Sequence, residues 1–365
     1  MPLDRIAVLG LGKVGALAAA LLAEAGLRVT GHDSRAPSAP LPFPVRGLDA
    51  ASSDAVVGAL ADADAVLSCL PYRFNARVAA IAAKLGIHYF DLTEDVPTTK
   101  AIRKLAETSA GVMAPQCGLA PGFIGIVGAH LAERFDTVRN IRLRVGALPQ
   151  HPTGLLGYAF NWSPEGVVNE YLNDCEVIED GVRKTVSSME WIEQIYIDGR
   201  RLEAFTTSGG LGTMCETYEG RAANLDYKSM RYPGHASLMN FFFHELLMRD
   251  DREQAGRILT AAKPPVDDDV VYIHASVEGM LDGGLTRREF VRALYPQVIA
   301  GARRTAIAWT TSASAAAVIE MVGNGTLPQR GFLKQEEVPL DAFLKTPSGA
   351  LFDAGPEAAL SGADR

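Results

Sequence analysis

A nine-residue stretch in the second half of the chain carries many polar side-chain tips. The stretch YKSMRYPGH, residues 227–235, contains two tyrosines, a lysine, an arginine and a histidine around a Pro-Gly turn. Arg231 could clamp a substrate carboxylate through two parallel hydrogen bonds. A histidine can titrate near neutral pH, so His235 could act as a general base. Tyr227 and Lys228 could add hydrogen bonds to the substrate, so the stretch predicts a site that binds and deprotonates a small polar molecule.

A second stretch with chemical potential is WSPEGVVNEY, residues 162–171. Ser163 can cap the helix that begins there, and Glu170 could present a catalytic carboxylate that holds a substrate ammonium. Each of these interpretations has a structural alternative. Arg231 could form an internal ion pair, His235 could simply begin a helix, and Glu170 could be a solvated helix residue.

The first 33 residues match the pattern of a dinucleotide-binding fold. An apolar run at residues 5–9 is followed by G-x-G-x-x-G at Gly10, Gly12 and Gly15, a helical run, and a β-like run that ends at Asp33. Gly10 permits the tight turn, Gly12 lets the pyrophosphate approach the backbone, and Gly15 allows close helix–strand packing. The helix N-terminus then offers free N–H groups to the phosphates. A glycine-rich turn in another kind of α/β protein is the alternative.

The residues around this turn also predict which dinucleotide binds. Lys13 and Val14 open the helix and belong to the expected phosphate-binding loop. Asp33 lies about 20 residues further on, where a carboxylate accepts the ribose hydroxyls and repels a 2′-phosphate. This predicts NAD as the cofactor. Arg35 follows closely and could soften the preference, so NADP stays the alternative.

The elements that must position these residues begin with a parallel sheet. Six strand-like runs alternate with helical runs up to residue 116, which predicts an α/β fold with a doubly wound parallel sheet. Ligands of such sheets bind beyond the carboxyl ends of the strands. The residues expected there, on the nicotinamide side, are Leu70, Pro71, Tyr72, Asp91, Leu92, Thr93, Cys117 and Gly118. We expect Asp91 to be catalytic and Thr93 to contact substrate; Asp91 could instead cap a loop, Tyr72 lie on the surface and Cys117 be a buried thiol.

After residue 125 the sequence no longer alternates regularly between strand-like and helical runs. Strand-like runs are joined by the hairpin signals EDGVRK and IDGRR, and helices are expected at about 164–172, 235–248 and 286–301. This pattern predicts an α+β substrate domain with a largely antiparallel sheet over residues 126–302.

The C-terminal part is expected to return to the first domain, residues 1–125. The stretch 303–352 begins with a helix rich in small residues, and small side chains let a helix lie close to another backbone. Residues 353–365 are expected to form a mobile tail.

The composition argues against several classes of function. The chain of 365 residues has a net charge of −8 with acidic and basic residues mixed, unlike the basic face that binds nucleic acid. The four cysteines form no C-x-x-C pair, so neither a zinc site nor a disulfide framework is expected. The most apolar helical stretch, GALAAALLAEAGL, is too short to span a bilayer and contains Glu24. We expect a soluble cytoplasmic protein that binds no metal, membrane or nucleic acid.

Several stretches together resemble the saccharopine dehydrogenase family, most closely its lysine 6-dehydrogenase branch. They are the glycine loop, LPYRFN at 70–75, YFDLTED at 89–95, CGLAPGF at 117–123, WSPEGVVNEY, YKSMRYPGH, and GFLKQEEV at 331–338. The resemblance implies NAD(P)-dependent oxidation at an amine-bearing carbon. In the lysine branch, lysine becomes the 6-semialdehyde with release of ammonia, and a homo-oligomer of at least two copies is expected. Many saccharopine reductases are longer and carry aspartate where this chain has Ala120, which favours the lysine branch.

The implied chemistry sets what the site must do. An ammonium cannot donate a hydride, so a base must first remove a proton, and the amine-bearing carbon must approach the nicotinamide ring closely. We therefore expect Arg231 and His235 to face the coenzyme. Two alternatives stay open: a saccharopine-type dehydrogenase that condenses a semialdehyde with an amino acid, and an NAD-binding sensor or assembly protein without catalytic activity.

Overall fold

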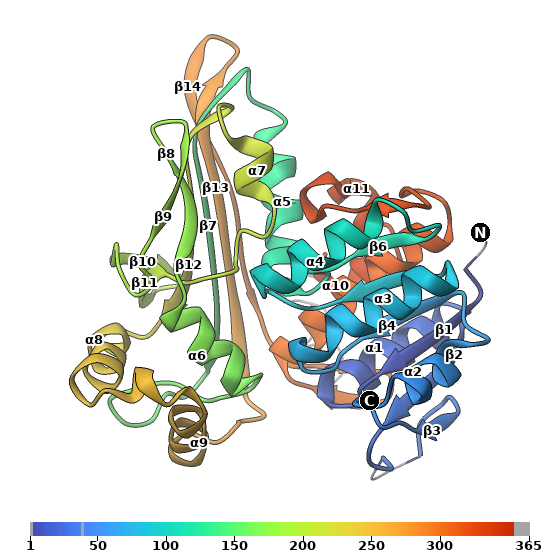
Figure 1. Ribbon diagram of the computed structural model, residues 1–365. Helices are drawn as coiled ribbons and strands as arrows, with labels where there is room; N and C mark the ends of the chain where they lie inside the picture. Colours follow the sequence, from blue (N-terminus) through green and yellow to red (C-terminus); the bar gives the residue numbers. More distant parts are fainter. Residues whose placement is uncertain (1–2, 38–39, 354–365) are drawn as a thin grey trace, which may run out of the picture. The chain divides into compact units, whose positions relative to one another are not determined.

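The structure, a computed structural model, describes residues 3–37 and 40–353 (Figure 1). The chain forms two compact units. The first contains Met1–Ile126, Ile299–Ala302 and Ala308–Arg365, and the second contains Val127–Val298 and Arg303–Ile307. Apart from Asp353, the expected tail at 353–365 lies outside the described residues.

Within the described residues, seven strands form the sheet of the first unit (Figure 1). They are β1 (Arg5–Leu9), β2 (Arg28–Asp33), β3 (Val45–Gly47), β4 (Ala65–Ser68), β5 (His88–Asp91), β6 (Val112–Ala114) and β17 (Gly331–Phe332). Their order is β17-β6-β5-β4-β1-β2-β3, and the neighbouring strands are parallel. This confirms the predicted doubly wound sheet. The sequence did not predict β17, because it has two residues and comes from far along the chain.

Helices cover this sheet. They are α1 (Lys13–Glu24), α2 (Ser53–Leu60), α3 (Asn75–Leu85), α4 (Val96–Ala106), α10 (Ala306–Gly323) and α11 (Leu340–Phe343), with the short turns η1 (Tyr72–Phe74), η2 (Leu119–Phe123), η5 (Gln335–Glu337) and η6 (Gly349–Phe352). α2, α3 and α4 share one hydrophobic core with residues of β1, β4 and β5. α10 lies beside α1, where the Ser312 hydroxyl donates a hydrogen bond to the Val14 carbonyl (2.8 Å).

By length and composition, α10 is apolar enough to cross a membrane, but 83% of it is buried. A buried apolar helix of this kind is common in the core of a folded domain. Its serine hydroxyls bond to carbonyl groups within the fold, as Ser312 does with Val14 and Ala308.

The second unit is built around a larger mixed sheet. Its described strands are β7 (Thr137–Pro149), β8 (Cys175–Glu179), β9 (Val182–Val186), β10 (Glu193–Ile197), β11 (Arg200–Thr206), β12 (Ala222–Arg231), β13 (Asp269–Leu281) and β14 (Gly284–Leu294). The main path runs β10-β11-β12-β7-β13-β14, with β8 pairing both β12 and β9. The pairing is antiparallel, as predicted, except that β12 runs parallel to β7. Pairing between segments so far apart leaves no local signal in the sequence.

The described helices of this unit are short. They are α5 (Ile124–Ala132, whose first residues belong to the first unit), α6 (Pro164–Leu172), α7 (Met214–Tyr218), α8 (His235–Asn240) and α9 (Arg252–Ala262), with the turns η3 (Phe241–Glu245) and η4 (Met248–Asp250). α6 has its predicted cap, since the Ser163 hydroxyl accepts a hydrogen bond from the Gly166 N–H (3.0 Å). The expected helix at 235–248 is broken into α8, η3 and η4, and Leu247 adopts a left-handed φ of 56°.

The expected helix at 286–301 is wrong. Its residues form most of β14 and the short strand β15 (Gln297–Ile299), which pairs with β16 (Ala302–Arg304) just beyond the expected helix. β14 pairs with β13 from Leu294 back to a turn at Asp282 and Gly283, both with positive φ (52° and 77°). An Asp-Gly turn of this kind favours a hairpin. Pairing with β13 from Val271 to Leu281 therefore outweighs the local helix propensity.

Candidate active site

The glycine loop of the first unit has the geometry that a dinucleotide requires. Gly10 has a φ of +90°, and a Cβ there would lie 2.8 Å from the Cys69 carbonyl oxygen. A Cβ on Gly15 would lie 1.9 Å from the Gly10 oxygen. At Gly12, by contrast, a Cβ would meet no heavy atom within 4 Å. The tight turn and the close packing thus need glycine inside the fold, whereas Gly12 borders open space that a pyrophosphate can fill.

Asp33 closes this loop at the end of β2. Its Oδ2 accepts a hydrogen bond from the Leu11 N–H (2.7 Å), and its Oδ1 accepts one from the Arg35 N–H (2.9 Å). Burial opposes the charged form, but these N–H groups hold the pKa of Asp33 below its usual value. The side chain therefore stays a carboxylate at neutral pH, which suits an acceptor for ribose hydroxyls. Lys13 and Val14 open α1 directly after Gly12.

The other predicted cofactor residues follow the carboxyl ends of parallel strands. Leu70, Pro71 and Tyr72 follow β4, Leu92 follows β5, and Cys117 and Gly118 follow β6. Cys117 is fully buried, and burial raises the pKa of its thiol well above the usual value. This favours the interpretation of Cys117 as an inert thiol. The Gly118 carbonyl accepts a hydrogen bond from the Ser314 hydroxyl of α10 (2.9 Å).

The Asp91 carboxylate is hydrogen-bonded to other residues of the first unit. Its carboxylate accepts hydrogen bonds from the Tyr89 hydroxyl (2.7 Å), the Thr93 N–H (3.0 Å) and the Gln116 N–H (3.0 Å). The side chain is fully buried, and burial raises its pKa to about 6. Gln116 has a φ of +68°, so the contact with Asp91 fixes a strained backbone next to Cys117. This environment supports a loop-holding role for Asp91 and not the predicted catalytic role.

Thr93 has a similar structural task. Its hydroxyl accepts a hydrogen bond from the Asp95 N–H (3.1 Å), and Asp95 in turn caps α4. Only 5% of Thr93 is exposed. The predicted contact of Thr93 with substrate therefore finds no support in its hydrogen bonds.

Arg231 is the centre of a buried polar cluster in the second unit. Its Nε donates a hydrogen bond to the Tyr171 hydroxyl (2.7 Å), and a terminal nitrogen lies 3.9 Å from a Glu170 carboxylate oxygen. The Tyr158 ring lies 4.7 Å from the guanidinium carbon. Burial opposes the charge, but these neighbours raise the pKa of Arg231, so it stays a cation. Besides its contact with the Glu170 carboxylate, a buried guanidinium of this kind is suited to bind the carboxylate of a ligand.

His235 is held at both ring nitrogens. Nδ1 lies 3.0 Å from the Leu156 carbonyl oxygen, and Nε2 lies 3.0 Å from the Tyr171 hydroxyl. A carbonyl can only accept, so Nδ1 carries the proton and Nε2 accepts from Tyr171. Burial and the nearby Arg231 lower the pKa of His235 to about 3. Its lone pair is engaged and its basicity is low, so the predicted role of His235 as general base is not supported.

The burial of His235 predicts a pH dependence of stability. In the unfolded chain its pKa is about 6.5, and in the folded chain it is about 3. Between these values the unfolded state binds more protons, so the free energy of unfolding must fall as the pH decreases. We expect a loss of about 2 kcal/mol between about pH 6.5 and pH 5 from this group alone. Urea unfolding at both pH values should show it, and His235→Gln should have a flatter dependence; equal slopes would contradict the assignment.

The Pro-Gly turn that leads to His235 is fixed by a carboxylate that the sequence did not single out. Glu203 on β11 accepts hydrogen bonds from the Gly234 N–H (2.8 Å) and the Ala236 N–H (2.7 Å). Glu203 pairs with Arg231 across the strands. Its position on the N-terminus of α8 explains how a short helix holds a buried histidine.

Tyr227 and Lys228 point to opposite faces of β12, because side chains alternate along a strand. Tyr227 shares the face of Arg231, and its ring packs where a Cβ on Gly210 would lie only 2.1 Å away. Lys228 donates hydrogen bonds to the Trp191 carbonyl (2.7 Å) and a Glu193 carboxylate oxygen (2.9 Å). Lys228 therefore belongs to an ion cluster on the other face, and its predicted role beside Arg231 is not supported.

Sequence reasoning missed the two tyrosines that surround Arg231. Tyr171 follows Glu170 in a stretch already singled out, and its hydroxyl contacts both Arg231 and His235. Tyr158 lies in the segment LLGYAFNW, where nothing but its aromatic character could have marked it. Both are buried, and buried tyrosine hydroxyls usually find a polar partner.

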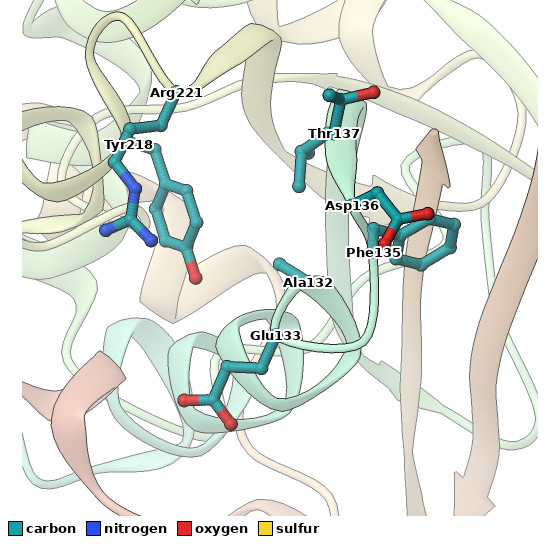
Figure 2. A pocket seen from close by; sticks show the side chains of 8 residues that line it. Ala132, Glu133, Phe135, Asp136, Thr137, Tyr218 and Arg221 are labelled. Atoms are coloured by element: carbon teal, nitrogen blue, oxygen red, sulfur yellow. The ribbon is translucent and has the colours of Figure 1, made fainter. Parts of the chain in front are cut away.

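A cavity of about 420 Å³ lies elsewhere in the second unit (Figure 2). The residues that line it come from the end of α5, its connection to β7, the start of β7, the end of α7 and the segment between α7 and β12. Tyr218 and Arg221 lie across the cavity from Asp136 and Thr137. None of the predicted site residues lines this cavity. Its size alone therefore does not identify the reaction site.

Two models from one protein family match successive parts of the chain. A family model described as the saccharopine dehydrogenase NADP binding domain matches residues 6–114. A second, described as the saccharopine dehydrogenase C-terminal domain, matches residues 118–347. Both the nucleotide loop and the Arg231 cluster fall within matched residues.

Individual relatives are distant. The mitochondrial alpha-aminoadipic semialdehyde synthase of Mus musculus is 23% identical over 194 residues, which is 49% of this chain and 20% of that protein. The NADP-linked, L-glutamate-forming saccharopine dehydrogenase of Saccharomyces cerevisiae is 28% identical over 150 residues, 39% of this chain and 33% of that one. The matched stretches thus span a third or less of these relatives. An apo structure of the yeast L-Glu-forming enzyme superposes with a TM-score of 0.73 at 19% identity, covering 94% of this chain and 96% of that one, which shows a shared fold.

Proposed function

Because this chain belongs to the saccharopine dehydrogenase family, we propose that it is an NAD-dependent dehydrogenase that oxidises the side-chain amine of an amino acid, with L-lysine as its substrate. Hydride loss leaves an imine, which water hydrolyses, so the products are 2-aminoadipate 6-semialdehyde and ammonia. The observation that carries the proposal is the buried Arg231 guanidinium 3.9 Å from the Glu170 carboxylate. Together they offer one cation and one anion to the carboxylate and ammonium of an amino acid.

Different residues of the chain have different roles in the proposed reaction. The open space at Gly12 and the carboxylate of Asp33 suit the pyrophosphate and ribose of the dinucleotide. When bound, the nicotinamide supplies the acceptor for the hydride. Arg231 holds the substrate carboxylate in this proposal, and Glu170 holds the ammonium or takes a proton before hydride transfer. Of the three predicted catalytic residues, Glu170 alone keeps a side chain that is not almost fully buried, with 12% of it accessible.

The direct test is turnover by the full-length protein. With NAD and L-lysine at alkaline pH, we expect NADH formation with one ammonia released for each NADH. Ornithine and other diamino acids form the comparison panel. Absence of NADH with every amine of the panel would overturn the proposal.

The similarity to the L-glutamate-forming saccharopine dehydrogenase of Saccharomyces cerevisiae favours a second candidate, a saccharopine-type dehydrogenase. Incubation with NADPH, the 6-semialdehyde and L-glutamate separates the two. A stable secondary amine detected by mass spectrometry supports the saccharopine reaction. A protein that binds NADH tightly without turning over either set of substrates would instead be a sensor or assembly factor.

The contacts of Asp33 predict a preference for NAD, although the matching domain model is described as NADP binding. In Asp33→Asn the amide oxygen can still accept from the Leu11 N–H, but the charge that repels a 2′-phosphate is gone. We expect the ratio of kcat/KM for NADP to that for NAD to rise about tenfold, helped by the neighbouring Arg35. Initial rates with both cofactors measure this ratio. An unchanged ratio would show that Asp33 does not determine the preference for NAD over NADP.

A further inference from the structure

The Tyr171 hydroxyl contacts both Arg231 and His235 in the buried cluster. It accepts a hydrogen bond from the Arg231 Nε (2.7 Å) and lies 3.0 Å from the His235 Nε2. His235 in turn lies 3.0 Å from the Leu156 carbonyl through Nδ1. Tyr171, Arg231 and His235 are each at least 97% buried. Water therefore cannot substitute for a missing partner without entering the core.

The donor and the acceptor of each hydrogen bond in this series follow from the chemistry of the groups. Arg231 has only donors, and a backbone carbonyl has only acceptor sites. Arg231 must therefore donate to the Tyr171 oxygen, which leaves the Tyr171 O–H to donate to the His235 Nε2. The protonated Nδ1 then donates to the Leu156 carbonyl. The order Arg231, Tyr171, His235, Leu156 satisfies every group only when the imidazole is neutral.

We propose that Tyr171 and His235 are positioning residues that aim the Arg231 guanidinium at the substrate carboxylate. The inference rests on the proposed function for the identity of the substrate. Tyr171 occupies Nε, and a second nitrogen donates to the Met230 carbonyl (2.9 Å). These two contacts fix the plane of the guanidinium and leave the terminal nitrogen nearest Glu170 for ligand. The pair thus determines specificity for amines that carry a carboxylate.

Tyr171→Phe tests the proposal because it removes only the hydroxyl. We expect KM for L-lysine to rise about tenfold to a hundredfold, because a hydrogen bond to a charged group is lost, while kcat changes less than about threefold. Cadaverine, which is lysine without its carboxylate, should keep its KM. A merely structural loss would weaken both substrates alike, and that result would overturn the proposal.

Two further variants make the test specific. Tyr232→Phe is the matched control, since its hydroxyl donates to the Pro149 carbonyl (2.8 Å) in the same turn and does not contact Arg231; KM for lysine should stay unchanged. His235→Gln keeps an acceptor for Tyr171 and should retain a nearly normal KM, whereas His235→Leu should resemble Tyr171→Phe. Equal effects of the glutamine and leucine variants would contradict the proton order.

A measurement that needs no turnover separates this inference from the proposed function. In the ¹⁵N NMR spectrum of the histidine-labelled full chain, assigned with His235→Gln, the His235 ring should show a protonated Nδ1 and an accepting Nε2. The same signal should persist at about pH 5, since the pKa of the buried ring lies near 3. A protonated Nε2, or an imidazolium at that pH, would overturn the hydrogen-bond order even if lysine proves to be the substrate.

Discussion

Arg231→Ala is expected to lower kcat/KM for L-lysine by about a hundredfold to a thousandfold. Removing one partner of a buried charge pair costs about 2–5 kcal/mol, and each 1.36 kcal/mol corresponds to a factor of about ten in rate. The loss should appear in steady-state rates of NADH formation with lysine. Cadaverine should lose far less, because it has no carboxylate for the guanidinium to bind.

Two variants separate this effect from a loss of folding. Arg231→Lys keeps the charge beside Glu170 but removes the planar fork, so we expect a smaller loss, carried mainly by KM. Arg257→Ala is the matched control, because Arg257 is an exposed arginine on α9 that pairs with Glu253 of the same helix. If the Arg231→Ala protein is folded and turns over lysine as fast as Arg257→Ala, Arg231 does not bind the substrate.

Gly12→Val is expected to weaken NAD binding about a hundredfold without lowering the melting temperature. A side chain at Gly12 meets no heavy atom within 4 Å in the fold, so it should clash with the dinucleotide alone, at a cost of about 1–3 kcal/mol. Fluorescence titration with NADH and thermal unfolding measure the two effects separately.

The neighbouring glycines supply the comparison. Gly15→Ala should destabilise the first unit itself, since the new Cβ would lie 1.9 Å from the Gly10 oxygen. Gly58→Ala on α2 should change neither property for the worse, because its added methyl meets nothing within 4 Å and alanine favours a helix. Equal melting temperatures for the Gly12 and Gly15 variants, with normal NADH affinity in both, would refute the assignment of the loop.

The nucleotide-binding part of the fold could be predicted from sequence because its signals are local. The turn at Gly10, the packing at Gly15 and the carboxylate at Asp33 each lie within one strand–helix–strand unit. The parallel pairing of β12 with β7 has no such signal, since the two strands are far apart in the chain. The hairpin of β13 and β14 does have a local signal, the Asp282-Gly283 turn, but the residues that follow it also fit a helical pattern.

The candidate substrate site was predictable in its charged residues and not in their partners. Arg231 stood out because arginine is the natural ligand for a carboxylate. Lys228 stood out equally, but the alternation of β12 places it in an ion cluster on the opposite face. His235 was expected to titrate near neutral pH. Only the three-dimensional contacts with Tyr171 and Leu156 show that its ring nitrogens are occupied.

The central claim is that a hydride leaves the amine-bearing carbon of lysine for the nicotinamide. L-lysine with two deuterium atoms at its side-chain amine carbon tests it most directly, by mass spectrometry of the NADH formed. The account predicts one deuterium in each NADH and one deuterium left in the semialdehyde. Unlabelled NADH, or no consumption of the lysine after long incubation with NAD, would contradict it.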